Sequence, residues 1–251
     1  FALWTIVRYP QLLGGSRATA PDPVDFHDFL GVDLYAPGAN MYHAFDGKPR
    51  PLERDHDKVL GTTEEAVRLE SVLGHNGGQL RSFEWVFSPR RADGELAFLF
   101  DRDTGAVDPA VAAYWRERYD IGHRIEADWP RLGRHLNGKV HVVVGTADSY
   151  YLDGPVRRLD ATFRKVGGRA DFRYVQGAPH SMSMLYAKDG DRNALWKEMS
   201  RAMYAVARPG QTWSAPLSPP LPRHRPRERA SADLSPHIMR SRSRDGPIPS
   251  R

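Results

Sequence analysis

The chain has 251 residues, of which 40% are hydrophobic and 10% aromatic. This length suits one large α/β domain or two small ones. The absence of cysteine excludes disulfides and thiolate chemistry, and no run approaches the roughly 18 apolar residues of a membrane-spanning helix. The formal net charge of +5 falls entirely in residues 209–251, which carry eight arginines and three acidic residues. Because residues 1–208 are neutral overall, composition gives no indication of binding to nucleic acid or membranes.

Residues 209–251 form a Pro/Arg-rich tail that contains nine of the twenty prolines and few large apolar side chains. Such a segment cannot bury enough apolar surface to offset its conformational entropy, so we predict disorder. The sequences "RSRSR" and "PRHRPRER" raise the alternative of RNA binding. No aromatic residue lies within this basic cluster to stack on bases. We therefore interpret the segment as a solvated tail, or as the translation of GC-rich DNA beyond the true stop codon. We expect no nucleic-acid partner.

The first part of the chain predicts a helix, a strand and a long irregular stretch. Residues 1–9 have apolar residues near helical spacing, although no capping residue precedes them. The sequence "LLGGSRATA" over residues 12–20 suits a short strand that leaves a glycine turn. Two prolines then break regular structure in residues 21–29. Residues 30–60 are predicted to be rich in loops.

Three helices and one region of short strands and turns are predicted in the middle of the chain. The helix over 62–74 has Thr62 or Thr63 as its N-cap and glutamates in its first turn. The helix over 108–120 begins with Asp108 as cap and proline at the first helical position. The remaining segments are short strands and turns over 82–108 and a helix over 126–138 that Asn137-Gly138 closes.

The last part of the folded chain alternates strands and helices. The β-branched run "KVHVVVG" (139–145) is typical of a buried parallel strand, and "ADFRYVQG" (170–177) predicts a second strand. Amphipathic helices are predicted after each strand, over 151–168 with the stripe Val156, Leu159, Phe163 and Val166, and over 190–207 with the stripe Leu195, Met199, Met203 and Val206. This order predicts an α/β fold with parallel strands and right-handed crossovers, whose chemistry lies at the carboxyl ends of the strands.

Asp148 and His180 follow these two strands in the loops "GTADSYYLDG" and "QGAPHSMSML", so we expect them to meet. The acid would accept the Nδ1 proton of the imidazole, and His180 would then be a general base. Two alternatives accompany this interpretation. Asp148 could simply cap the following helix. Asp153 competes as the acid, although its position before Pro155 predicts a helix cap.

Other candidate residues are weaker. Ser16 lies in "GGSRA", which follows a helix and precedes a strand, the reverse of the order that a nucleophile turn needs. Ser149, Ser181 and Ser183 neighbour Asp148 or His180 but share their loops. His27 lies near three aspartates (Asp25, Asp28 and Asp33), in a spacing that matches no common metal-ligand pattern. No P-loop or dinucleotide fingerprint is present, and we expect neither a metal nor a cofactor.

The chain resembles a bacterial esterase family of the α/β-hydrolase superfamily, close to enterochelin esterases and S-formylglutathione hydrolases. The resemblance covers residues 1–205 and is carried by "VRYPQLLGG", "TAPDPVDFHDFLGVDLYAPGANMY", "GGQLRSFEWVFSPR", "TGAVDP" and "VHVVVGTADSYYLDGPVRRL". It implies that Asp148 is the acid and His180 the base of a catalytic triad. In such enzymes the serine lies in G-x-S-x-G, on the turn between a strand and the next helix.

The resemblance also implies what the 251 residues lack. The helix over 1–9 resembles the one that follows the nucleophile turn, so the serine is expected just before Phe1 and the chain is expected to be the C-terminal part of a hydrolase domain (1–208). Residues 26–136 would be a cap or insertion. Tyr35, Tyr42, Phe45 and Trp85 are candidate pocket walls, although simple packing is the preferred interpretation for each. The innermost of three retained strands would then be an exposed sheet edge that favours association.

Two functions follow as expectations. The first is a serine-dependent carboxylic ester hydrolase that acts on a small-molecule ester through an acyl-serine intermediate, with the 251 residues inactive alone. The second is a non-catalytic binding or assembly module that keeps the fold without the nucleophile. The ester, the oligomeric state and the compartment are left open by the sequence.

Overall fold

The computed structural model describes residues 1–73, 77–181 and 191–213, which belong to one compact unit. Its centre is a three-stranded parallel sheet with the order β1-β4-β5. The strands are β1 (Ser16–Thr19), β4 (Val140–Gly145) and β5 (Asp171–Val175). The α/β class and the parallel strands predicted from the sequence are confirmed. Most of the tail predicted over 209–251 lies outside the described residues, which end at 213, so its predicted disorder stays a prediction.

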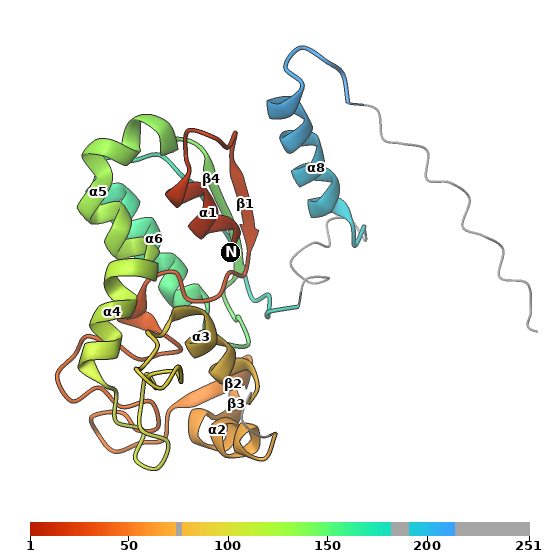
Figure 1. The fold of residues 1–251 in the computed structure, drawn as a ribbon. Helices are drawn as coiled ribbons and strands as arrows, with labels where there is room; N and C mark the ends of the chain where they lie inside the picture. The colour runs from red at the N-terminus through yellow and green to blue at the C-terminus, as the bar shows by residue number, and fades with distance from the viewer. Residues whose placement is uncertain (74–76, 182–190, 214–251) are drawn as a thin grey trace, which may run out of the picture. The chain divides into compact units, whose positions relative to one another are not determined.

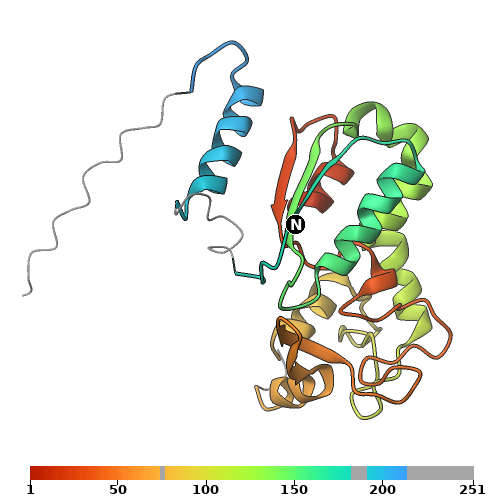
Figure 2. The same ribbon diagram turned by 180° about the vertical axis from the view of Figure 1, so that it is seen from behind.

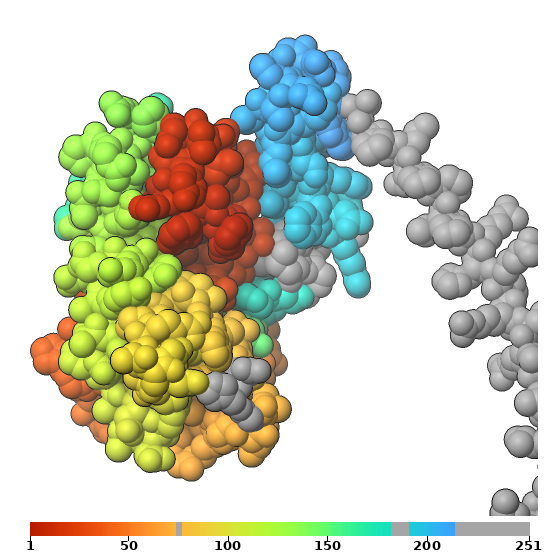
Figure 3. Space-filling model, viewed as in Figure 1, coloured from red at the N-terminus to blue at the C-terminus, as the bar shows by residue number. Residues whose placement is uncertain are grey.

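Helices flank this sheet on both sides (Figures 1 and 2). One layer contains α1 (Ala2–Arg8), α5 (Ile121–Leu136) and α6 (Asp153–Lys165), in which α5 contacts both of the other helices. The space-filling view shows the side chains of α1 directly against those of α5 (Figure 3). On the other side, α8 (Ala194–Ala207) packs through Leu195 and Met199, and its Glu198 pairs with Arg173 of β5 at 3.1 Å.

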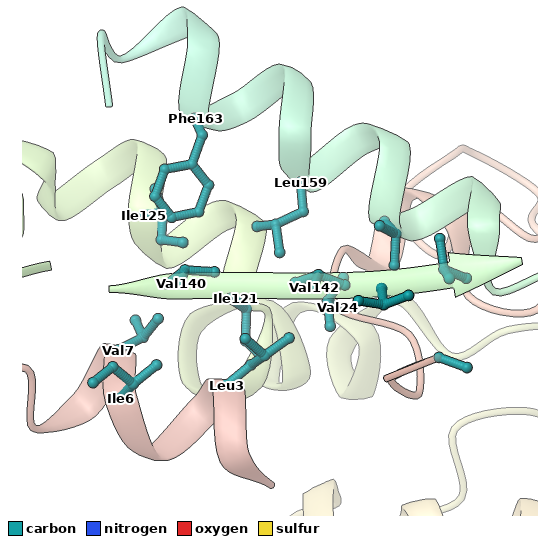
Figure 4. Packing of buried hydrophobic residues seen from close by; sticks show 14 of the residues in the cluster. Leu3, Ile6, Val7, Val24, Ile121, Ile125, Val140, Val142, Leu159 and Phe163 are labelled. Carbon is teal, nitrogen blue, oxygen red and sulfur yellow. The ribbon is translucent and has the colours of Figure 1, made fainter. Parts of the chain in front are cut away.

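The sheet core is the apolar cluster between these layers. Its members from β4 are Val140, Val142, Val143 and Val144, and α6 adds Val156, Leu159 and Phe163. Figure 4 shows side chains of α1, α5 and α6 converging on β4. Burial of this β-branched run explains why "KVHVVVG" forms a strand, because a central parallel strand is covered on both faces.

A second core lies in the part of the chain between β1 and α5 and centres on Trp115, which is fully buried among aromatic rings. The elements around it are the 3₁₀ turn η1 (Phe26–Asp28), β2 (Pro51–Asp55), β3 (Lys58–Thr62), α2 (Thr63–Ser71), α3 (Gln79–Phe87) and α4 (Pro109–Tyr119). Thr62 forms the capping box of α2 with Glu65, and Asp108 caps α4, as the sequence predicts.

Three predictions of secondary structure need correction. Residues 79–87 form α3, which includes the first six residues of the stretch 82–108 predicted as short strands and turns. The carboxylate of Glu70 in α2 accepts hydrogen bonds from the amides of Leu80 and Arg81 at the start of this helix. Within the stretch predicted as loops, β2 and β3 form an antiparallel hairpin. Helix α5 begins at Ile121, five residues earlier than predicted, because Asp120 caps it.

The apolar stripes predicted for the two helices after β4 and β5 differ in how deeply they are buried. In α6, Val156, Leu159 and Phe163 are buried, as expected. In α8, Leu195 and Met199 are buried, whereas Met203 and Val206 are more than half exposed. Helix α5, which lies within the expected insertion over 26–136, packs in the sheet core through Ile121, Ile125, Leu132 and Leu136.

Candidate active site

The loops after β4 and β5 are bonded to each other at the carboxyl end of the sheet. The amide of Ala147 donates to the carbonyl of Ala178 at 3.1 Å, and the amide of Gly177 donates to Oγ1 of Thr146 at 2.8 Å. Gly145 makes this approach possible, because a Cβ there would lie 2.0 Å from the carbonyl oxygen of Ala178. The two loops therefore hold the residues that follow them close together.

Asp148 and His180 meet across these loops. Nδ1 of His180 lies 3.0 Å from Oδ2 of Asp148, whose side chain is fully buried. The other carboxylate oxygen of Asp148, Oδ1, accepts hydrogen bonds from the amides of Tyr150 (2.9 Å) and Leu152 (3.2 Å). Asp148 therefore shapes its own turn with one oxygen and holds the imidazole with the other. The alternative that it caps the following helix is wrong, because α6 begins at Asp153 without a side-chain cap hydrogen bond.

The environment favours the protonated form of His180. The hydrogen bond to Asp148 raises its pKa above the ordinary value of 6.5, against a smaller opposing effect of burial. The charges of Asp148 and Asp22 raise it further. An imidazolium formed during proton transfer is thus stabilised, which is what a general base paired with a carboxylate requires.

Arg54 of β2 binds the turn that carries Asp148. No local sequence pattern identifies this arginine as part of the site. Its Nε donates to the carbonyl of Asp148 at 2.9 Å, and its backbone amide donates to the carbonyl of Ser149 at 2.8 Å. Its guanidinium pairs with Asp153 at 3.1 Å and stacks over the ring of Tyr151, 4.2 Å from the centroid. Tyr151 has a left-handed backbone (φ 61°), an unfavourable conformation that these contacts stabilise.

Asp153 does not have the role predicted from the sequence. Helix α6 begins at Asp153 itself, after Leu152, and shows no side-chain cap hydrogen bond. The carboxylate is used instead in the pair with Arg54 and in a second pair with Arg157 at 3.4 Å.

A pocket of about 450 Å³ opens beside His180. We call it the His180 pocket. Its apolar wall comes from the hairpin, α2, α3 and two loops, and its polar lining includes Tyr150, whose ring meets the imidazole edge-on at 5.1 Å. The apolar lining residues are Leu30, Leu52, Ala66, Leu69, Leu80, Phe83 and Leu152.

The four aromatic residues named as candidate pocket walls do not line the His180 pocket. Tyr35 donates from its hydroxyl to Asp120 at 2.6 Å, and Tyr42 is buried with its hydroxyl on the carbonyl of Arg102. Phe45 is largely exposed, and Trp85 lies beside the guanidinium groups of two arginines. Six aliphatic residues and Phe83 form the apolar wall instead, and no local sequence pattern identifies them.

The serines of the described chain differ in their distance from this site. Ser16 is at the amino end of β1, paired in register with Val140, and thus at the opposite end of the sheet from Asp148 and His180. Oγ of Ser149 faces the backbone amide of His180 at 3.4 Å. Ser181 shares the loop of His180, and Ser183 lies outside the described residues.

The aspartates near His27 do not form a metal site. Nδ1 of His27 pairs with Asp33 at 3.1 Å, and Asp25 binds the amide of His27. Within residues 1–73, 77–181 and 191–213, no group of three or more His, Cys, Asp or Glu side chains is placed to hold a metal ion. In the same described part of the chain, every helix is too short or too polar to cross a bilayer.

Comparison of the chain with models of protein families, with curated proteins and with solved structures finds no match. The resemblance noted in the sequence therefore stays an expectation.

Proposed function

We propose that Asp148 and His180 are the orienting acid and the general base of a serine-dependent carboxylic ester hydrolase of α/β-hydrolase type. The observation that carries the proposal is the 3.0 Å contact between Oδ2 of Asp148 and Nδ1 of His180. It joins a fully buried carboxylate to a half-buried imidazole at the carboxyl ends of adjacent parallel strands. In chain order the acid precedes the histidine, as in α/β-hydrolases.

The contact assigns a role to each ring nitrogen. With Nδ1–H donating to Asp148, Nε2 is the nitrogen that accepts a proton from a serine hydroxyl as its oxygen attacks the ester carbonyl. His180 then returns that proton to the departing alcohol, which leaves an acyl-serine. A water molecule, deprotonated in the same way, releases the acid and regenerates the serine.

The proposal expects the serine in the segment that leads into α1. Asp22 lies three residues after β1 and lines the His180 pocket, so the carboxyl end of β1 lies beside that pocket. Figures 1 and 2 show the N-terminus, from which α1 starts, next to the carboxyl end of β1. A hydroxyl presented there would approach the imidazole from the side of β1.

The test uses the protein encoded by the complete reading frame. We expect it to hydrolyse p-nitrophenyl butyrate and to react covalently with a fluorophosphonate, with the labelled serine mapping to a G-x-S-x-G sequence just before Phe1. His180→Ala should lower kcat by about 10⁶-fold and Asp148→Asn by about 10⁴-fold. His141→Ala is the matched control and should leave kcat unchanged, because His141 pairs with Asp171 at the opposite end of the sheet.

Two outcomes would contradict the proposal. Hydrolysis that survives His180→Ala would remove His180 from the chemistry. A protein that binds esters with Asp148 and His180 intact but neither hydrolyses them nor reacts with the fluorophosphonate would be a binding module instead.

A further inference from the structure

The His180 pocket has a chemical character that goes beyond ester hydrolysis. Seven of its twelve lining residues have aliphatic or aromatic hydrocarbon side chains. They come from segments far apart in sequence, including Leu52 of the hairpin and Phe83 of α3. Its volume of about 450 Å³ is within the usual range for a small-molecule site. An apolar chain in this pocket would exchange water for hydrocarbon contacts.

The charges at the pocket are all of one sign when His180 is neutral. Asp22 and Glu70 line it, and among the described residues its lining contains neither lysine nor arginine. Glu70 is held in place because its two oxygens accept the amides of Leu80 and Arg81 at 2.8 and 3.1 Å. A carboxylate of the ligand brought into this pocket would lose its hydration and meet two like charges, with no lysine or arginine among the described lining residues to pair with.

We infer that the His180 pocket binds an uncharged, apolar chain of the ester substrate and excludes chains that end in a carboxylate. That the bound ester is a substrate rests on the proposed function. The selectivity of the pocket is a separate property, because it can be measured by binding alone.

The experiment compares two esters that differ only at the far end of the chain. Methyl hexanoate ends in a methyl group, and monomethyl adipate has a carboxylate in its place. Each is titrated at pH 8 into the 251-residue protein, and binding is followed by NMR at the His180 imidazole and the leucine methyl groups. We expect methyl hexanoate to shift the His180 and Leu69 signals saturably, and monomethyl adipate to bind at least about tenfold more weakly.

Two leucines provide a matched pair of variants. Leu69 and Leu73 are 66% and 63% exposed, so neither substitution threatens the fold, but only Leu69 lines the pocket. Leu69→Ser should weaken methyl hexanoate binding about threefold, whereas Leu73→Ser should leave it unchanged. Asp22→Asn should narrow the difference between the two esters, because it removes one of the two negative charges.

The inference is overturned if the two esters bind equally, if neither binds saturably, or if Leu73→Ser weakens binding as much as Leu69→Ser. These outcomes are separable from failure of the hydrolase proposal. If the ester binds selectively but the protein encoded by the complete reading frame does not hydrolyse esters, the inference about the pocket stands and the hydrolase proposal fails. If both esters are hydrolysed with equal kcat/KM, the hydrolase proposal stands and the inference about the pocket fails.

Discussion

At the scale of single residues, Asp120 shows how one buried carboxylate joins the two cores. Its Oδ1 caps α5 by accepting the amide of His123 at 2.9 Å. Its Oδ2 accepts the amide of Phe26 at 2.9 Å and the hydroxyl of Tyr35 at 2.6 Å. Burial and the negative charge of Asp120 raise the pKa of Tyr35, so its hydroxyl remains a donor at any physiological pH.

Tyr35→Phe should therefore lower the free energy of unfolding by about 1 kcal/mol, because one hydrogen bond to a buried carboxylate is lost while two others remain. Urea unfolding of the 251-residue protein measures the change. Tyr114→Phe is the control, since no hydrogen bond of its hydroxyl is found among the described residues. Equal effects of the two substitutions would show that the contact with Asp120 contributes nothing.

The same scale shows how much of the site the sequence could predict. Asp148 and His180 were identified because the positions after two β-branched strands can be read locally, and parallel strands bring their carboxyl ends together. Arg54 could not be identified in this way. Its partners lie about 95 residues away, and its role depends on a hairpin whose burial pattern is too weak to mark it as a strand.

At the scale of secondary-structure elements, long-range contacts decide the cases where local pattern fails. Helix α3 begins at Gln79 without a side-chain cap of its own, and Glu70 of α2 supplies the acceptors for its first amides. The hairpin β2–β3 is similarly fixed from outside, by the bonds of Arg54 to the Asp148 turn. By contrast, α2, α4 and α6 were predicted well because their caps or apolar stripes lie within their own sequences.

The contact between Arg54 of the hairpin and the Asp148 turn predicts an effect on the pKa of His180. Arg54→Gln removes the guanidinium that holds the Asp148 turn, so we expect the Asp148–His180 contact to loosen and the pKa of His180 to fall toward 6.5. NMR titration of the imidazole measures this change. The matched control is Arg50→Gln, because Arg50 binds the carbonyls of Gly31, Asn40 and His43 and none in the Asp148 turn. An unchanged pKa in Arg54→Gln would show that the turn holds its shape without Arg54.

At the scale of the whole molecule, several contacts link the sheet core and the second core, and two of them are examples. Asp120 bonds to groups of both, and Leu152 of the second core immediately precedes α6, whose buried face belongs to the sheet core. Because these residues contact both cores, unfolding of one core alone would also break contacts of the other. The molecule is therefore expected to behave as one cooperative unit.

Native-state hydrogen exchange tests this expectation. The slowest amides of β4 in the sheet core and of α4 in the second core should open with the same free energy, and both values should fall equally on addition of urea. A lower value for α4 with a smaller dependence on urea would show that the second core unfolds separately. In that case the pocket wall that it supplies would open independently of His180.

The central claim is that a buried Asp148 holds His180 as a base, and the pKa of the imidazole tests it most directly. NMR titration should place the pKa of His180 above 6.5 in the 251-residue protein and closer to 6.5 in Asp148→Asn, because the substitution removes the carboxylate charge. The proposed hydrolase needs neutral His180, so its kcat/KM should fall as the pH drops through the raised value. Asp171→Asn, beside His141, is the control and should leave His180 unchanged. An imidazole with the same pKa in the parent protein and in Asp148→Asn would contradict the account.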